Sequence, residues 1–326
     1  MFSISLETII LEEYLSNIFL IMISREKEQR LVAIYFYICD LYESELKYTC
    51  QRFSNNSHPR FTDQEILTIY LFAGYEQKYF YIKDIQSFTR DYLISWFPKL
   101  PSYQTFNFRL NKLTGALEAI ANILIGTFKP LDCSSFVSMV DSMPIITCEG
   151  KNRKGKVAPE LTAKGYCSTK SKYYYGCKIH TLASRREGTI PFPESIMITP
   201  AQDNDLSVFK QAWGDTITNQ VILEDKIYSD KEYFNAQKRQ LQDIDMLTPV
   251  KEIKGDTKEN KQRNKAFNDL FSCAVSKVRQ PIESFLNWLI EKTDIQRAMK
   301  VRSTAGLIIH LFGKISIAFI NLIFNY

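Results

Sequence analysis

Histidine is scarce in this sequence, and the cysteines are not arranged in pairs. The chain of 326 residues has three histidines and seven cysteines, and no Cys-x-x-Cys spacing occurs. Structural zinc sites and disulfide frameworks need such ligands in closely spaced sets, so we expect neither. Unpaired thiols are typical of a reducing compartment, which favours a cytoplasmic protein.

Uninterrupted apolar runs and internal repeats are also missing. The apolar N-terminal stretch is broken by Glu7, Glu12 and Glu13, and no basic segment precedes it, so an amphipathic helix is expected instead of a signal sequence. The apolar C-terminal stretch carries Lys314 in its middle. We therefore expect a buried terminal helix there and no membrane span.

The sequence has no strong excess of one charge. Apolar residues make up 45% and charged residues 24%, as in folded soluble proteins. Lys and Arg exceed Asp and Glu by 41 to 36, a mild basic balance that suits a nucleic-acid partner without requiring one. Local clustering of charge therefore carries more information than the total.

Residues 1–130 show helical patterns. Thr62 and Glu65 form a capping-box signature before an apolar run. The stretch KLPSYQTFNFRLNKL predicts another helix start, and Arg109 and Lys112 lie on that helix. Such side chains can hold phosphates or read base edges, although a helix with a solvated polar face has the same pattern. We predict an all-α region that binds DNA.

From residue 131 to 326 strand patterns predominate. Strands are predicted at SSFVSMVD, KYYYGCKIHTLAS, ESIMITPA, NQVILED and DMLTPV. Helices are predicted at NDLSVFKQAWG and DKEYFNAQKRQLQ, and a long one begins at about residue 266 or 280. This order predicts an α/β domain with a mixed sheet flanked by helices.

Two of these strands are followed by acidic residues. The first apolar run leads into Asp141, and the run from Val221 to Leu223 leads into Glu224 and Asp225. If the two runs are neighbouring strands, Asp141 and Asp225 emerge at one edge, where their repulsion favours a cation between them. Carboxylate oxygens without nearby His or Cys favour Mg²⁺ or Mn²⁺.

A third carboxylate is predicted on the long helix. Val278, Ile282, Phe285 and Leu289 recur at helical spacing and predict a core-facing stripe. Arg279, Glu283 and Asn287 lie along an adjacent face at intervals of four, so Arg279 is one turn from Glu283. An Arg–Glu pair on a helix surface is the alternative interpretation of this helix taken alone.

Several of these stretches together resemble one family. They are VDSMPI, YYYGCKIHTLAS, GTIPFPESIMITPAQDNDL, LEDKIYS and VRQPIES, with looser likeness in FTDQEIL and LPSYQTFNFRL. They resemble the DDE transposases of bacterial insertion sequences, which have a ribonuclease-H-like core, and most closely the branch numbered nine-eight-two. The resemblance covers most of the chain.

The resemblance implies a site and a reaction. Asp141, Asp225 and Glu283 would be the catalytic residues and would hold two Mg²⁺ (or Mn²⁺) ions, and Arg279 or Lys226 would steady phosphate charge. The partners would be the terminal inverted repeats and the target DNA, with the protein forming a homo-oligomer on DNA in the bacterial cytoplasm. Cleavage at the element's ends would precede strand transfer.

The sequence departs from the family pattern near two of these residues. Ile227 stands where the family usually has glycine, so a β-branched residue must form a turn that glycine enters more easily. Pro281 either starts the helix before Glu283 or kinks a longer one. Two alternatives therefore stay open: a DNA-binding remnant without catalysis, and a nuclease on the same core without strand transfer.

Other carboxylates have simpler interpretations. Glu224 points away from Asp225 if the strand is regular. Asp230 is expected to cap the helix that follows it, and Asp205, although it resembles a family position, is expected to be an N-cap as well.

Two basic stretches fit DNA binding. The first contains the predicted phosphate contacts Lys151, Arg153, Lys154, Lys156 and Lys172, with Tyr173 to Tyr175 following. The second, from Lys251 to Lys265, is a polar connection diluted by acidic residues. Solvated loops without a partner are the alternative for both stretches.

Overall fold

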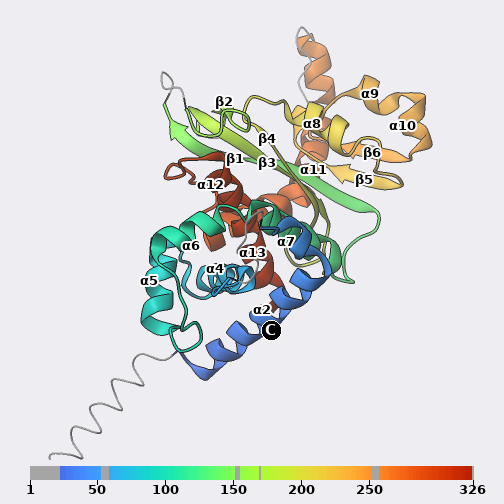
Figure 1. Ribbon diagram of the computed structural model, residues 1–326. Coiled ribbons are helices and arrows are strands. Elements are labelled where there is room, and N and C mark those ends of the chain that lie inside the picture. Colours follow the sequence, from blue (N-terminus) through green and yellow to red (C-terminus); the bar gives the residue numbers. More distant parts are fainter. Residues whose placement is uncertain (1–22, 53–58, 151–154, 169, 251–256, 325–326) are drawn as a thin grey trace, which may run out of the picture. The chain divides into compact units, whose positions relative to one another are not determined.

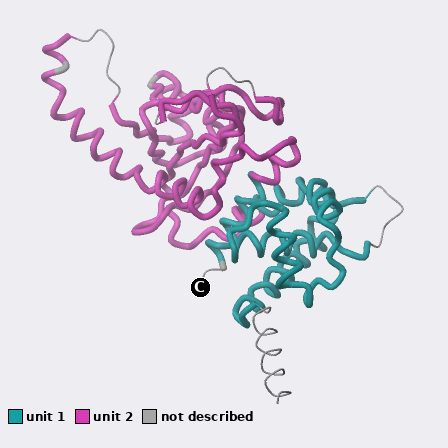
Figure 2. The backbone as a smooth tube through the Cα atoms, turned by 90° about the vertical axis from the view of Figure 1, so that its left-hand side faces the viewer, with its two compact units in different colours: residues 1–122, 311–326 teal, residues 123–310 magenta. Residues whose placement is uncertain are grey.

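The computed structural model describes residues 23–52, 59–150, 155–168, 170–250 and 257–324. The chain divides into two compact units, one formed by residues 1–122 with 311–326 and the other by residues 123–310 (Figure 2). The sequence placed the boundary between the helical region and the sheet domain at residue 130. The last residues of the chain, predicted to belong with the sheet, are grouped with the N-terminal helices instead.

The first unit is helical, as predicted. Its described elements are α2 (Arg25–Leu41), the π-helical turn η1 (Tyr42–Leu46), α3 (Lys47–Thr49), α4 (Asp63–Gln77), α5 (Ile82–Tyr92), α6 (Tyr103–Leu110), α7 (Thr114–Thr127), which crosses the boundary, and α13 (Lys314–Phe324). Helix α4 is the centre, since it packs against α2, α5, α6 and α13. Gly74 allows the close approach of α13, because a Cβ there would lie 2.3 Å from the Ile317 Cδ1 atom.

Two polar features hold the start of α4. The Thr62 side chain accepts from the Glu65 backbone N–H and the Glu65 carboxylate accepts from the Thr62 N–H, so the predicted capping box is confirmed. Asp63 is only 3% exposed and pairs with both Arg52 and Arg109. Two guanidinium groups compensate the buried carboxylate, as a buried charge requires.

The second unit contains a six-stranded mixed sheet, which confirms the predicted fold class (Figure 1). The strands are β1 (Val137–Glu149), β2 (Ala163–Cys167), β3 (Lys172–Ser184), β4 (Phe192–Pro200), β5 (Gln220–Leu223) and β6 (Ile244–Leu247). Their order is β2-β3-β1-β5-β6, and β4 also pairs with β3. Strands β5 and β6 run parallel to β1, whereas the pairs involving β3 are antiparallel. This mixed pattern is that of a ribonuclease-H-like sheet.

Helices flank this sheet. They are α8 (Asp205–Ala212), the 3₁₀ turn η2 (Lys226–Tyr228), α9 (Lys231–Asn235), α10 (Gln237–Leu241), α11 (Lys258–Thr293), α12 (Thr304–Ile308) and the π-helical turn η3 (Ile309–Gly313), which crosses into the first unit. One core cluster joins β1, β5 and α8 through Val140, Ile222 and Phe209. Helix α11 packs against β1 and β5, and Ile282, Phe285 and Leu289 are buried as the helical spacing predicted. Val278, predicted to share that stripe, is 37% exposed instead.

Several predicted boundaries were wrong. Strand β1 continues eight residues past Asp141, so this carboxylate lies within the strand and not at its end. Strand β2 was missed, and the helix predicted over residues 230–242 is two short helices separated at Ala236. Helix α11 begins at Lys258, because Thr257 accepts from the Asn260 N–H and caps it. The basic residues from 258 to 265 are thus helical, while residues 251–256 lie outside the described part.

In the described residues one helical stretch, Thr304–Ile323, is long and apolar enough to cross a membrane. Within its apolar window 61% is buried inside the structure. Leu307, Ile315 and Phe319 are among the buried residues. Core helices of soluble proteins share this composition, and the buried terminal helix is what the sequence predicted.

Candidate active site

Asp141 lies on the central strand of the sheet, directly opposite Thr181 on β3. Its carboxylate accepts from the Ser142 backbone N–H at 2.8 Å. Burial raises the pKa of Asp141 to about 6, and the charges of Glu283 and Asp225 add to this, while Arg279 acts in the opposite direction. Asp141 is therefore a desolvated carboxyl group that a nearby cation would stabilise in its charged form.

Arg279 is that cation in this conformation. Its Nη1 lies 3.2 Å from the Asp141 Oδ2, and its Nη2 pairs with the Glu283 carboxylate one turn further along α11. The Arg279 side chain is only 13% exposed, whereas Glu283 is 51% exposed. One guanidinium therefore joins two of the three predicted carboxylates, from elements 138 residues apart.

Asp225 follows β5, the parallel neighbour of β1. Met139 pairs with Leu223 across these strands, so Asp141 and Asp225 each lie two residues beyond a paired position. Asp225 caps the turn η2 and accepts from the Lys226 N–H at 2.7 Å. Its charge contributes to the raised pKa of Asp141. The register thus brings the second carboxylate, at the end of β5, alongside Asp141 within β1.

The two departures from the family pattern are accommodated locally. Ile227 lies in η2 and is not among the residues with positive φ, so its β-branched side chain causes no backbone strain there. Pro281 lies inside α11, which rules out the alternative that it starts the helix. The Arg279–Glu283 pair forms across this proline.

Glu224 is a buried carboxyl group that sequence reasoning set aside. It is 0% exposed, and neither of its oxygens has a hydrogen-bond partner within the described residues. Burial raises its pKa well above the usual value, and the charges of Asp141 and Asp205 raise it further. The alternation along β5 indicated that it faces away from Asp225, but nothing local indicated complete burial.

Asp205 does not have the predicted capping role. Asn204 is the N-cap of α8, since its side chain accepts from the Ser207 N–H. Asp205 instead pairs with Lys178 at 2.9 Å, and its Oδ1 lies 3.6 Å from the His180 Nδ1. Lys178 and His180 are two residues apart on β3 and so lie on the same face of the sheet. This spacing could have indicated from the sequence that both contact one partner. Asp230 does cap α9, as predicted.

The predicted DNA contacts have different surroundings. Lys226, Lys156, Lys172 and Lys112 are exposed. Lys112 lies 5.7 Å from the centre of the exposed Phe108 ring on α6. Arg109 instead donates to Asp63 and to the Cys50 carbonyl oxygen, so its guanidinium has a structural role. The remaining predicted contacts, Lys151, Arg153 and Lys154, lie outside the described residues.

The predicted carboxylates are the kind of ligand that divalent metal ions prefer, but they are not yet close enough together to hold one. No three His, Cys, Asp or Glu side chains in the described parts of the chain lie close enough together to hold one as they stand. In donor type, however, Asp141, Asp225 and Glu283 fit hard cations, since they offer carboxylate oxygens. In charge they fit as well, because the Arg279 guanidinium already lies between Asp141 and Glu283.

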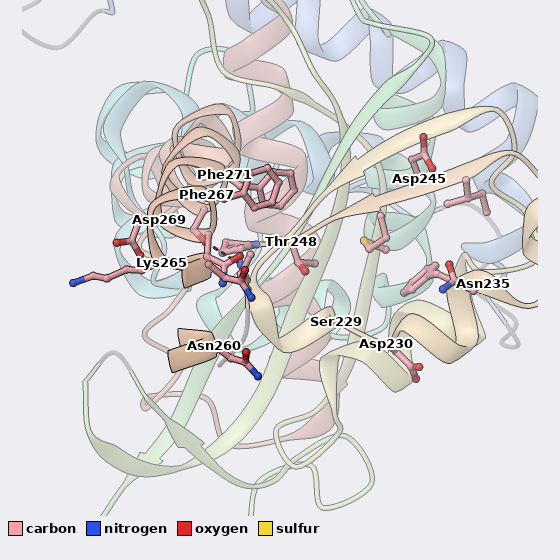
Figure 3. Close-up of a pocket in the computed structure, with 18 of the residues that line it drawn as sticks. Ser229, Asp230, Asn235, Asp245, Thr248, Asn260, Lys265, Phe267, Asp269 and Phe271 are labelled. Carbon is pink, nitrogen blue, oxygen red and sulfur yellow. Dashed lines mark hydrogen bonds between the residues drawn. The ribbon is translucent and has the colours of Figure 1, made fainter. Parts of the chain in front are cut away.

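An open groove of about 1490 Å³ lies elsewhere in the second unit (Figure 3). Its walls come from β6, α9 and the first half of α11, and include Asp245, Thr248, Phe267 and Phe271. None of the three predicted carboxylates lines it. The groove is therefore not the site at which Asp141, Arg279 and Glu283 meet.

Comparison with known proteins identifies one family. The model described as "Transposase DDE domain" matches residues 136–318, which is more than half of the chain. The matched segment includes β1, β5 and α11, and with them the three predicted carboxylates and Arg279. Among curated proteins, none matches the sequence with significance.

Proposed function

The chain belongs to the transposase DDE domain family, and from this premise we propose that it cleaves DNA at the ends of an insertion sequence and joins those ends to a target. Family membership implies a transposase- or nuclease-type enzyme that binds DNA. The finer assignments are part of the proposal: the branch numbered nine-eight-two, a homo-oligomer assembled on the terminal repeats, and a place in the bacterial cytoplasm.

Asp141, Asp225 and Glu283 are the proposed catalytic carboxylates. They would hold two Mg²⁺ or Mn²⁺ ions, which when bound would polarise a scissile phosphate and favour deprotonation of an attacking hydroxyl. Asp141 would be the central member of this set, because β1 pairs with β5, which leads into Asp225, and packs against α11, which carries Glu283.

The cationic side chains have separate roles in this proposal. Arg279 holds Glu283 towards Asp141 and balances the charge of both carboxylates before substrate binds. Lys226 is exposed beside Asp225 and is proposed to contact a phosphate that enters the site. Binding of divalent ions would have to replace the contacts that Arg279 now makes with the two carboxylates.

The wider DNA surface is proposed from exposed lysines. Lys156 and Lys172 lie in the sheet unit, and Lys112 lies in the turn after α6 in the helical unit. Lys151, Arg153 and Lys154 are kept as proposed contacts from the sequence alone. Arg109 is left out because Asp63 occupies its guanidinium group. The catalytic domain, predicted over residues 131–326, is proposed to be the sheet unit, residues 123–310, because all three carboxylates lie in it.

The observation that best supports catalysis is the bridge that Arg279 makes between Asp141 and Glu283. Taking a carboxylate and a guanidinium out of water is costly, and hydrophobic residues could fill the same positions at less cost. This arrangement therefore favours a working site over a degenerate one. The unstrained turn at Ile227 also favours a working site over a remnant.

Nicking of supercoiled plasmid with Mn²⁺ tests the proposal. We expect Asp141→Asn and Glu283→Gln each to lower the rate at least about 100-fold, since metal-ion stabilisation of the transition state is worth several kcal/mol. DNA affinity should not fall, because neither substitution removes a cation. Asp132→Asn, an exposed carboxylate paired with Arg186 in the same unit, is the matched control and should cleave normally.

The outcomes separate the alternatives. Binding without any nicking by the unsubstituted protein would indicate a DNA-binding remnant. Nicking that persists in Asp141→Asn would refute the assigned site. If cut element ends and target DNA are supplied and no joined product forms, the protein is a nuclease without strand transfer.

A further inference from the structure

The hairpin of β2 and β3 carries an exposed pair of tyrosines. Tyr166 and Tyr173 lie directly opposite each other in the antiparallel register. Their ring centres are 4.9 Å apart with planes inclined at 55°, and the side chains are 51% and 40% exposed. The Lys164 ammonium lies 5.1 Å from the Tyr173 ring centre. Two aromatic rings and a cation thus form one surface on the outside of the sheet.

The other face of this hairpin attaches it to the sheet domain. Tyr174 is 2% exposed and packs in a cluster with Ile146 and Ala201. Gly165, opposite Tyr174, allows this packing, since a Cβ there would lie 2.8 Å from the Ala201 Cβ. The hairpin is therefore held in place by the face that lacks Tyr166 and Tyr173. Those two rings are not needed to fill a core.

The tyrosine surface lies on the same face of the sheet as Asp141. Thr181 of β3 is opposite Asp141. The register between the two strands shifts once, by an extra residue of β1 between Ile146 and Cys148, so β3 itself stays regular from Tyr173 to Thr181. Side chains eight residues apart on a strand share a face. At about 3.3 Å per residue the separation along the strand is roughly 26 Å. One DNA strand of about eight stacked nucleotides covers that distance.

The chemistry of the surface indicates a nucleobase as its ligand. Bases stack on exposed aromatic rings with little regard to sequence, and a lysine beside the ring can contact the adjoining phosphate. Within a duplex, base faces are covered by their neighbours, so only an unpaired base offers a free face. We propose that Tyr166 and Tyr173, with Lys164, bind an unpaired base of the DNA strand that reaches Asp141. This inference rests on the proposed function, because it takes DNA as the substrate.

The test compares single-stranded and double-stranded DNA of one sequence, with 2-aminopurine as the stacking probe. With the full-length protein, single strands should show a fluorescence change on binding. Tyr166→Ala should reduce that change and weaken single-strand affinity about tenfold, the size of one lost base–aromatic stack. Tyr166→Phe keeps the ring and should behave as the unsubstituted protein. Affinity for the duplex should be the same for all three.

Phe267→Ala is the matched control, because Phe267 is an aromatic residue of the same unit that is 72% exposed and lies outside the hairpin. It should leave both affinities unchanged. The proposal is overturned if Tyr166→Ala binds single strands as well as the unsubstituted protein does. An equal loss for single strands and duplex also overturns it, since a phosphate contact or a folding defect would then explain the result.

The stacking surface and the proposed catalytic function can be refuted independently of each other. Plasmid nicking that depends on Asp141, together with unaltered single-strand binding by Tyr166→Ala, would refute only the stacking surface. Stacking that depends on Tyr166 in a protein that never nicks DNA would refute only the catalytic assignment.

Discussion

His180 shows how strongly the surroundings of one residue change its chemistry. It is 1% exposed on β3, and its Nε2 lies 2.9 Å from the Thr199 hydroxyl. Burial lowers the pKa of His180 to about 4, and Lys178 lowers it as well, although the Asp205 carboxylate acts in the opposite direction. The imidazole is therefore neutral at physiological pH, because burial disfavours its charged form.

A pH dependence of stability follows from His180. Its pKa is about 4 in the folded protein against an ordinary 6.5, so between these values the unfolded chain binds a proton that the folded chain does not. The contribution of the neutral His180 to the free energy of unfolding is therefore complete above pH 6.5 and is lost as the pH falls towards 4. We expect His180→Gln to flatten the fall in the urea midpoint between pH 7 and pH 5.

Thr199→Val is the control for this measurement. It removes the hydrogen bond to the imidazole but leaves the titrating group in place, so the fall towards pH 5 should persist. Equal pH slopes for His180→Gln and the unsubstituted protein would contradict the assignment.

Helix α11 is the element that brings the site together. It runs without interruption from Lys258 to Thr293, and Pro281 lies within it. Its second half is anchored by Ile282, Phe285 and Leu289, while no residue before Val275 is buried in the described part of the helix. Arg279 and Glu283 lie where the helix passes from exposed to buried surroundings. The anchored half thus holds these residues against β1.

Pro281 should weaken this helix. A proline in a helix interior lacks an N–H donor and crowds the preceding turn, at a cost of about 3 kcal/mol relative to alanine. We expect Pro281→Ala to raise the stability of the protein by ~1–3 kcal/mol in urea unfolding. Plasmid nicking should be retained, because the Arg279–Glu283 pair needs only the spacing of one helical turn.

Ser276→Ala, an exposed position of the same helix, is the comparison and should change stability by less than about 0.5 kcal/mol. A less stable Pro281→Ala protein would show that the helix depends on the proline. Loss of nicking in a folded Pro281→Ala protein would show that it positions Glu283.

At the scale of the whole molecule, the two ends of the chain belong to one unit. Residues 311–326 are grouped with residues 1–122 (Figure 2). Helix α13 packs on α4 at Gly74. Ile315, Ile317 and Ile320 of α13 are each no more than 2% exposed. The sheet unit is thus inserted in sequence between two parts of the helical unit.

Removal of residues 311–326 should therefore unfold the helical unit. Loss of a fully buried isoleucine costs about 2–5 kcal/mol, so three such losses approach or exceed the 5–15 kcal/mol that stabilises a typical domain. Hydrogen exchange should show loss of protection at Ile66–Gly74 of α4. The strands β1 and β3, which belong to the other unit, should stay protected.

Ile317→Val removes one methylene group from the same helix and should leave α4 protected, since such changes cost about 0.5–1.5 kcal/mol. Continued protection of α4 in the truncated chain would show that α13 is not part of its core.

Local features of the protein could be derived from the sequence by itself. The capping box of Thr62 and Glu65, the cap at Asp230 and the Arg279–Glu283 pair each involve residues three or four positions apart. Their geometry is set by the helix repeat and does not depend on what surrounds them. The order of the longer strands and helices, and with it the fold class, followed from hydrophobic patterns of the same short range, although β2 was missed.

Contacts between distant segments were decided only by the tertiary structure. Asp141 pairs with Arg279, which is 138 residues away in the sequence. Glu224 and His180 are buried away from solvent, and α13 is grouped with the N-terminal helices. Desolvation and strand register depend on which surfaces pack together, and a pattern within one segment carries no record of its partner. The sequence therefore determined which carboxylates and rings the protein has at its strands, whereas packing decided which of them are buried, bridged or exposed.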